Sequence, residues 1–174
     1  NWQRDAATIL ENMGKQFVAM AEPQRAIQSF RKSLSLREGL AASTEDPRWQ
    51  QEVEGAYWYV GKLMRSIGRY EEARETAEQY LLATSYGVGG NERVRRVGRA
   101  LGTLCWSALN AKNIEQAIWA GERATAFAPD LPWPRINYAH ALMFSAQDTD
   151  RAKARAIYRN IDALPADEAA KLKL

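Results

Sequence analysis

The sequence predicts an all-α protein built from repeated pairs of antiparallel helices. Apolar residues recur at spacings of three and four, and no stretch shows the period-two alternation that is typical of strands. The segment Trp2-Gln3-Arg4-Asp5 returns as Trp49-Gln50-Gln51-Glu52, so the offset from position 2 to position 49 is 47 residues. A fixed offset of this length is the signature of a repeat architecture.

Helix-breaking residues divide the chain into eight expected helices. They are expected at about 3–20, 23–42, 47–67, 70–86, 92–111, 114–127, 133–146 and 150–163, with a short ninth helix at about 167–173. Asp46 is expected to cap the helix that begins at Pro47, because proline fits the first helical position. Asn91 is expected to cap the fifth helix, and residues 147–150 are expected to form a longer turn.

Small residues recur within the predicted helix pairs at a constant spacing of 12 residues. The pairs are Gly14 with Ala26, Gly61 with Ala73, and Cys105 with Ala117. Small side chains at both places let two antiparallel helices approach each other closely, so we expect these residues to be buried.

The composition fits a folded chain of one domain. Of its 174 residues, 46% are hydrophobic and 26% are charged, and the net charge of +3 is too small to imply a nucleic-acid or membrane partner. There is no apolar run near 18 residues and no signal-like segment. The single cysteine, Cys105, excludes an internal disulfide and fits a reducing compartment, so we expect a cytoplasmic protein. The chain opens with Asn1 rather than Met, and we expect it to be part of a longer protein.

The pattern of large and small residues resembles the tetratricopeptide repeat. Pro129 stands where the closing proline of that repeat is expected, and four units are expected near 7–40, 54–87, 98–131 and 132–165. The resemblance implies a right-handed superhelical solenoid of four helix pairs, forming a single domain over 1–174. The 47-residue offset exceeds the usual 34. The extra residues near 41–51 resemble the elongated repeats of kinesin light chains and the Trp-Gln-Arg-Asp arrays of large bacterial proteins. They are expected to lengthen the second helix of one pair and the first helix of the next.

This resemblance also implies a groove lined by the first helix of each pair, in which a peptide or partner domain lies. The residues that match this face are Glu11, Lys15, Trp58, Lys62, Arg65, Arg99, Trp106 and His140. Tryptophan provides a large apolar anchor, and a basic surround favours an acidic segment or a free carboxylate. The alternative is that Trp58 and Trp106 pack between neighbouring helices. Glu11 and Lys15 do not match the chaperone-binding subtype, so a chaperone carboxylate clamp is not expected.

Three further features have two interpretations each. Trp2 and Trp49 form either an exposed recognition ridge or the cover of the elongated joint between repeats, and we favour the cover. Gly121 replaces the aromatic residue that the repeat pattern expects, which leaves the third packing layer least well defined. A basic cluster at the start of the fifth helix either contacts phosphate or is a solvated or internally paired face. Its members are Arg93, Arg95, Arg96 and Arg99, and the expected internal partners are Glu71, Glu72, Glu75 and Glu78.

The sequence predicts no enzyme, no cofactor and no metal site. His140 has no neighbouring nucleophile at a suitable spacing, and Gly87-Val88-Gly89-Gly90 lacks the Lys-Ser/Thr of a phosphate loop. The leading hypothesis is a non-catalytic scaffold that binds another protein, or another domain of the same parent chain. The alternative is a regulatory sensor module that restrains an effector domain in a bacterial signalling or defence protein. A third hypothesis is nucleic-acid binding through Arg93 to Arg99, and the sequence makes no prediction of the oligomeric state.

Overall fold

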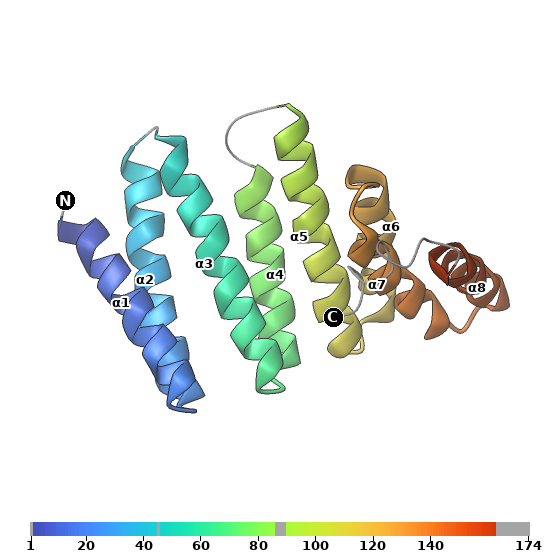
Figure 1. Ribbon diagram of the computed structural model, residues 1–174, viewed down its shortest axis with the longest axis horizontal. Coiled ribbons are helices and arrows are strands. Elements are labelled where there is room, and N and C mark those ends of the chain that lie inside the picture. The colour runs from blue at the N-terminus through green and yellow to red at the C-terminus, as the bar shows by residue number, and fades with distance from the viewer. Residues whose placement is uncertain (1, 45, 86–89, 163–174) are drawn as a thin grey trace. The chain divides into compact units, whose positions relative to one another are not determined.

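The protein is all-α in the part of the chain that the structure describes. A computed structural model describes residues 2–44, 46–85 and 90–162, which form eight helices and no strand (Figure 1). The chain divides into two compact units, Asn1–Gly89 and Gly90–Leu174. The single domain over 1–174 stays a prediction, and the expected helix at 167–173 lies outside the described residues. None of the described helices is both long and apolar enough to cross a membrane.

The first unit consists of four antiparallel helices that pack in chain order. They are α1 (Trp2–Ala19), α2 (Pro23–Ser43), α3 (Pro47–Ser66) and α4 (Tyr70–Ser85). The main cluster of buried side chains joins α2, α3 and α4 and consists of Ala26, Ile27, Phe30, Val60, Leu63, Met64 and Ala73. A second cluster of Leu34, Val53 and Ala83 lies toward the other end of the same three helices. Burial of these apolar surfaces is the main force that holds the four helices together.

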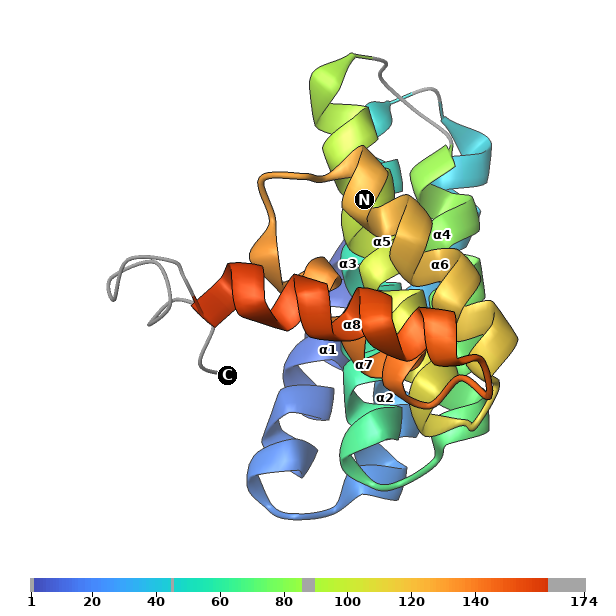
Figure 2. The ribbon, with the colours of Figure 1, turned by 90° about the vertical axis from the view of Figure 1, so that its right-hand side faces the viewer.

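The second unit also contains four helices, of which the last three are shorter than any helix of the first unit. They are α5 (Asn91–Asn110), α6 (Ile114–Phe127), α7 (Pro132–Met143) and α8 (Asp148–Asp162). Helix α5 packs against α6 and α7, α6 also packs against α7, and α7 packs against α8, which is nearest the viewer in Figure 2. Glycines on α5 permit the close approach. A Cβ atom on Gly98 would lie 2.5 Å from Cβ of Ala128, and one on Gly102 would lie 2.6 Å from the Trp133 ring.

The predicted helix bounds agree with the observed bounds to within two residues, except at the end of α7. Helix α7 ends at Met143 rather than near 146, and the turn lies at residues 144–147 rather than at 147–150. Ser145 fixes the turn, because its Oγ accepts from the Gln147 backbone N–H at 3.2 Å and donates to Asp150 at 2.5 Å. Asp148 and Asp150 then lie in the first turn of α8, where the helix dipole favours negative charge.

The caps at the helix starts are only partly as predicted. The Asp46 side chain accepts from the Arg48 backbone N–H at 3.0 Å and so caps α3 as expected. The prediction for Asn91 is wrong, because the cap position of α5 is occupied by Gly90 and Asn91 is the first helical residue. Gly90 has φ of +91°, a conformation that glycine adopts without the cost that a Cβ atom imposes.

The ends of α1, α3 and α5 share one turn. Ala21, Gly68 and Lys112 follow these helices with φ of +56°, +75° and +63°. The residue after each donates its backbone N–H to a carbonyl five residues earlier, for example Arg69 to Met64 at 2.9 Å. This left-handed cap turns the chain back into the following helix. The offset from Ala21 to Gly68 is again 47 residues, so the repeat is present in the backbone conformation as well as in the sequence.

The expected small-residue positions are buried. Gly14, Gly61 and Cys105 lie inside their units, and each expected alanine partner is fully buried. The third layer, which the sequence left least defined, is filled by α7. Tyr138 packs against Gly121, where a Cβ atom would lie 2.9 Å from it. Gly121 therefore makes room for the aromatic ring of a neighbouring helix instead of supplying one.

Candidate functional site

Three aromatic rings line one side of the first unit. Tyr59 on α3 stacks on Phe30 of α2 with ring centroids 6.0 Å apart and an interplanar angle of 9°. The edge-to-face contact between Tyr59 and Trp58 has a centroid distance of 5.1 Å. Trp58 is 38% exposed, so one part of its ring packs and the other part is open to solvent. Trp58 thus packs in part between side chains of its own unit, and its role as an anchor stays a prediction.

Two lysines lie over these rings. Lys15 of α1 is 5.6 Å from the Tyr59 ring centroid, and Lys62 of α3 is 5.2 Å from the Trp58 ring centroid. Lys15 also pairs with Glu11 at 2.5 Å, whereas Lys62 has no ion-pair partner among the described residues. Lys62 therefore offers an uncompensated positive charge next to exposed aromatic surface.

The rings of Phe30 and Tyr59 and the two lysines border a depression of about 380 Å³ in the first unit. Its lining consists of Lys15, Val18, Phe30, Tyr59, Lys62, Leu63 and Ser66. The floor is apolar, and the two ammonium groups are at its edge. Such a depression suits an apolar side chain that is followed or preceded by a negative group.

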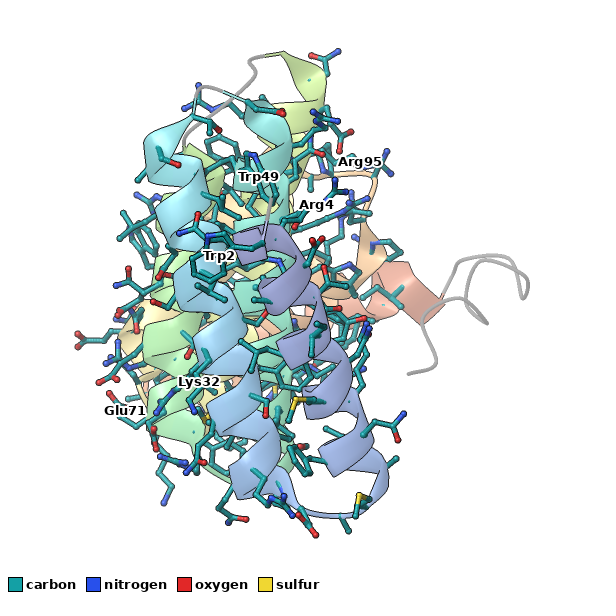
Figure 3. The ribbon with its side chains drawn as sticks, turned by 90° about the vertical axis from the view of Figure 1, so that its left-hand side faces the viewer. Trp2, Arg4, Lys32, Trp49, Glu71 and Arg95 are labelled. Atoms are coloured by element: carbon teal, nitrogen blue, oxygen red, sulfur yellow. The ribbon has the colours of Figure 1, made fainter. Side chains whose placement is uncertain are left out.

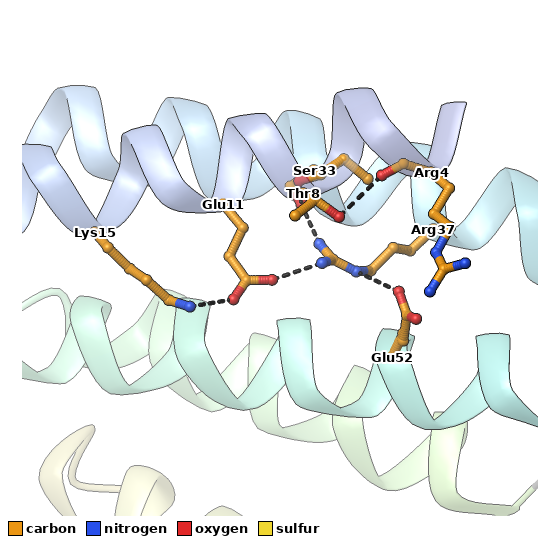
Figure 4. A network of polar contacts seen from close by, with 8 residues as sticks. Arg4, Thr8, Glu11, Lys15, Ser33, Arg37 and Glu52 are labelled. Atoms are coloured by element: carbon orange, nitrogen blue, oxygen red, sulfur yellow. Dashed lines mark hydrogen bonds and ion pairs between the residues drawn. The ribbon is translucent and has the colours of Figure 1, made fainter. Parts of the chain in front are cut away.

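Glu11 belongs to a different feature, a buried ion network that joins α1, α2 and α3 (Figure 4). The guanidinium of Arg37 donates to Glu11 at 2.5 Å, to Glu52 at 3.2 Å and to the hydroxyl of Ser33. Burial acts to raise the pKa of the Glu11 carboxyl, but its pairs with Lys15 and Arg37 outweigh burial and hold that pKa below its ordinary value. Glu11 therefore stabilises the helix joint, and its carboxylate is already engaged.

Arg65 is the fifth predicted groove residue of the first unit. It is half-buried on α3, and burial lowers the pKa of its guanidinium. It is not among the residues that line the depression at Tyr59. Of the five predicted residues, Lys15, Trp58 and Lys62 thus lie together, while Glu11 and Arg65 have other surroundings.

In the second unit, Trp106 and His140 lie together with Tyr158. The ring centroids are 6.1 Å apart for Trp106 and His140 and 5.7 Å apart for His140 and Tyr158, both edge to face. The Nδ1 atom of His140 is 2.8 Å from the carbonyl oxygen of Ile136. Because a carbonyl only accepts, Nδ1 carries the proton, and Nε2 is the acceptor of the neutral ring. The carbonyl thus fixes both the tautomer and the orientation of the imidazole.

Trp106 and His140 border a second depression, of about 550 Å³. Its lining consists of Trp106, Leu109, Asn110, Lys112, Ile114, His140 and Phe144. Lys112 is the non-glycine residue with left-handed backbone described above, and Phe144 is 68% exposed. This depression again combines an apolar floor, an exposed aromatic ring and a lysine. Arg99 is not among its lining residues.

Arg95 of the basic cluster on α5 has an internal partner, and three carboxylates of the acidic run pair with arginines of the first unit. Arg95 pairs with Asp130 of its own unit at 2.6 Å. In the acidic run, Glu78 pairs with Arg74 at 2.6 Å, and Glu72 pairs with Arg31 at 3.1 Å. Glu71 also pairs with Arg74, and Glu72 also with Arg69. Glu71, Glu72 and Glu78 thus pair with arginines on α2, on α4 and directly before α4, while their pairing with the basic cluster stays a prediction.

The sequence missed several residues at these sites. Tyr59 lies at the centre of the first depression and Arg37 at the centre of the ion network, and neither was singled out. Tyr59 directly follows Trp58, and Arg37 continues the stripe of Phe30 and Leu34 at helical spacing. An arginine in an apolar stripe signals a buried ion pair, because an unpaired buried charge is too costly.

The thiol of Cys105 is buried in the second unit. Burial raises the pKa of the Cys105 thiol to about 12, so the thiolate that would act as a nucleophile is not formed near neutral pH. Among the described residues, no group of three or more His, Cys, Asp or Glu side chains is arranged to hold a metal ion.

Of the comparisons with known proteins, the one with solved structures gives matches. No protein-family model matches the sequence, and no curated protein matches it. Among solved structures, the chain is similar to the protein named "MamA RS-1 ArsTM double mutant", with 14% sequence identity and a TM-score of 0.47. The likeness covers 92% of this chain and 98% of that chain. A likeness at this level shows neither a family nor a function.

Proposed function

We propose that the chain is a non-catalytic protein-interaction module that binds an acidic peptide segment through the depression at Tyr59. The observation that carries the proposal is Lys62, an uncompensated cation beside the exposed ring of Trp58. A bulky apolar side chain of the ligand would fill the depression against Phe30 and Leu63. A neighbouring Asp or Glu of the ligand would approach Lys62.

Energetics favour this mode of binding over a purely apolar contact. Rigid aromatic side chains supply contact area at a low entropic cost, and tryptophan is enriched among the residues that dominate binding. A positive charge at the edge of the contact raises the association rate and excludes basic partners. Lys15 contributes less, because Glu11 already neutralises it.

The second unit supports the same chemistry independently. Its depression also combines an exposed aromatic residue, Trp106, with a lysine, Lys112. Two such sites in one chain fit a partner with more than one short binding segment, since linked segments bind more tightly than either alone.

The proposal also includes finer statements about the architecture and the partner. The helix pairs would belong to one tetratricopeptide-like array with a right-handed superhelical path. The partner would be another protein, or another domain of the same parent chain. The repeated turn at Ala21, Gly68 and Lys112 and the 47-residue offset support the repeat character of this array.

A peptide selection tests the proposed ligand chemistry. A random peptide library displayed on phage is selected against the immobilised chain, and the enriched peptides are measured by fluorescence anisotropy. We expect peptides in which a bulky apolar residue neighbours Asp or Glu. Lys62→Glu should weaken their binding by about tenfold or more, since it replaces an attraction with a repulsion.

The matched control is Lys32→Glu. Lys32 is an exposed lysine of α2 in the same unit and has no ion-pair partner among the described residues (Figure 3). It reproduces the change in net charge without touching the depression. Equal weakening by the two variants, or a selection without acidic peptides, would show that the depression is not the binding site.

A further inference from the structure

Helix α1 carries an uncovered apolar stripe along its whole length. Trp2, Ile9 and Met13 are 71%, 59% and 44% exposed, and Met20, directly after the helix, is 60% exposed. Ala6 is half-buried and Gln16 is exposed. These six positions follow one another at spacings of four and three residues, so they share one face of the helix. Large apolar residues gathered on one face usually mark an interaction surface.

The repeat shows what covers such a stripe. At the offset of 47 residues, the same positions of α3 are Trp49, Val53, Ala56, Val60, Leu63 and Ile67. Val53, Val60 and Leu63 are only 4%, 3% and 8% exposed. They lie in the two apolar clusters that also contain Ile27, Phe30 and Leu34 of α2. The stripe of α3 is therefore buried against the second helix of the preceding pair.

A charged position repeats along with the stripe. On α3, Glu52 accepts a hydrogen bond from Arg37 of α2 at 3.2 Å. Its counterpart on α1 is Asp5, which is exposed and has no ion-pair partner among the described residues. Asp5 thus places a carboxylate on α1 at the position where Glu52 of α3 binds an arginine.

The aromatic start of the helix repeats as well. Trp49 lies under the guanidinium of Arg4, which is 5.9 Å from its ring centroid and belongs to the first helix of the preceding pair. The counterpart of Trp49 is Trp2, whose ring lies open at the start of α1 (Figure 3). At the start of α3, the tryptophan packs at the joint between two helix pairs. At the start of α1, the matching tryptophan has no such neighbour within the first unit.

We propose that this face of α1 is a docking surface for one further helix pair. That pair would have the same repeat pattern and would precede α1 as α1 and α2 precede α3. The second helix of that pair would match α2, with apolar residues at spacings of three and four and an arginine opposite Asp5. A second copy of the chain does not fit this description, because its own α2 is already covered by α1 and α3. The inference is independent of the proposed peptide binding.

An extended chain tests the proposal. Residues 1–47 are placed a second time in front of Asn1, which keeps the offset of 47 residues and puts the inserted copy of α2 next to the stripe of α1. Urea unfolding followed by circular dichroism is then compared between the extended and the original 174-residue chains. The first variant is the double substitution Ile9→Glu with Met13→Glu, made in the original helix α1 and not in the inserted copy. The control variant is Leu82→Glu, which changes an exposed apolar residue on α4.

In the original chain, we expect Ile9→Glu with Met13→Glu to change the unfolding constant by about threefold or less, as surface changes do. In the extended chain, the same change should raise that constant by about 30-fold or more, because the charge at position 13, which matches the buried Val60, is then buried without a partner and the charge at position 9 is half-buried. Leu82→Glu should have equal effects in both chains. A double-mutant cycle in the extended chain combines Asp5→Asn of the original α1 with Arg37→Met of the inserted copy. Non-additive effects on the free energy of unfolding would confirm that these two residues face each other.

Two outcomes would overturn the proposal. In the first, Ile9→Glu with Met13→Glu has the same effect in both chains, so the inserted pair does not contact the stripe. In the second, sedimentation shows that the original chain forms a dimer that dissociates with this change, so the occupant is a second copy.

Discussion

Replacing Arg37 with methionine should destabilise the first unit more than any exposed ion-pair substitution. Methionine keeps most of the apolar stem and removes only the charged group. The guanidinium side chain is 6% exposed and donates to two carboxylates and to the Ser33 hydroxyl, which in turn donates to the Ala7 carbonyl at 2.7 Å. Arg37→Met thus removes the group that joins α1, α2 and α3.

The magnitude follows from how far each partner is buried. Removing one member of a fully buried pair costs about 3–5 kcal/mol, because the other charge stays buried and unpaired. The side chains of Glu11 and Glu52 are 24% and 37% exposed, so water can partly hydrate them once Arg37 is gone. A hydrogen bond to a charged group contributes about 1.5–3 kcal/mol. We therefore expect a loss of about 2–3 kcal/mol, or about 4–12 °C in melting temperature for a chain of this size.

Thermal and urea unfolding followed by circular dichroism measure this loss, with Arg48→Met as the control. Arg48 pairs with Asp46 at 2.7 Å, but its side chain is 83% exposed. The backbone cap from Asp46 to the Arg48 N–H survives the substitution. Exposed pairs contribute little to stability because water screens them, so the control should lie close to the wild type.

A second variant separates the loss of charge pairing from the loss of packing. In Arg37→Met with Glu11→Gln and Glu52→Gln, no carboxylate is left unpaired at the joint, so part of the lost stability should return. Equal stability of Arg37→Met and Arg48→Met would refute the assignment of Arg37 as the central group of the joint. A triple variant less stable than Arg37→Met alone would refute the explanation by unpaired charge.

Three further expectations concern single residues. Gly102→Ala should destabilise the second unit by about 1–3 kcal/mol in urea unfolding, since its Cβ atom would meet the Trp133 ring. Its control is Gly39→Ala, which has open space around it and should stabilise helix α2 by about 0.5–1 kcal/mol. Cys105 should not react with Ellman's reagent at pH 8 until denaturant is added, and rapid reaction of the folded chain would contradict its burial. The lowered pKa of Glu11 stabilises the fold above the ordinary value of 4.5, and this contribution is lost as the pH falls through the lowered pKa. Glu11→Gln should therefore reduce the dependence of stability on pH below about 4.5, and an unchanged pH profile would contradict the pairing.

The helices could be predicted from the sequence because their signals are local. Proline, glycine and the period of apolar residues mark each helix, and these signals do not depend on distant parts of the chain. The end of α7 was misplaced because the sequence does not show that the Ser145 hydroxyl accepts from the backbone and ends the helix there. Asn91 was misassigned for a similar reason, since both Gly90 and Asn91 are acceptable cap residues.

The candidate site was only partly predictable, because its geometry depends on how each helix is rotated about its axis. Trp58 and Tyr59 are about 100° apart on α3. A small rotation decides which of the two faces α1, and here Tyr59 lines the depression while Trp58 packs against the edge of Tyr59. Arg37 could be recognised as buried from its stripe, but its partners Glu11 and Glu52 come from two other helices. Their pairing follows from packing that no local pattern encodes.

The extra residues of the 47-residue offset explain why the helices of the first unit are held together by other kinds of contact than the helices of the second unit. They extend α2 to Ser43 and begin α3 at Pro47, and this added length carries the contacts of Arg37 with Glu52 and of Arg4 with Trp49. These contacts are ionic and aromatic, so this joint should weaken as its carboxylates are protonated at low pH.

In the second unit, a turn connects α6 to α7. The joint between α5 and α7 depends on the close approach of the two helices at Gly102. The Asn137 side chain donates to the Gly102 carbonyl at 3.2 Å, and the Trp133 ring lies where a Cβ atom would be. The ion pair in this region, between Arg95 and Asp130, is exposed, whereas the close approach at Gly102 leaves no room for one more methyl group. The joint of the first unit thus depends mainly on charge, and that of the second unit mainly on steric fit. The exposed Trp2 and Asp5 of α1 repeat the charged form of the joint, which is why we expect a partner of the same repeat there.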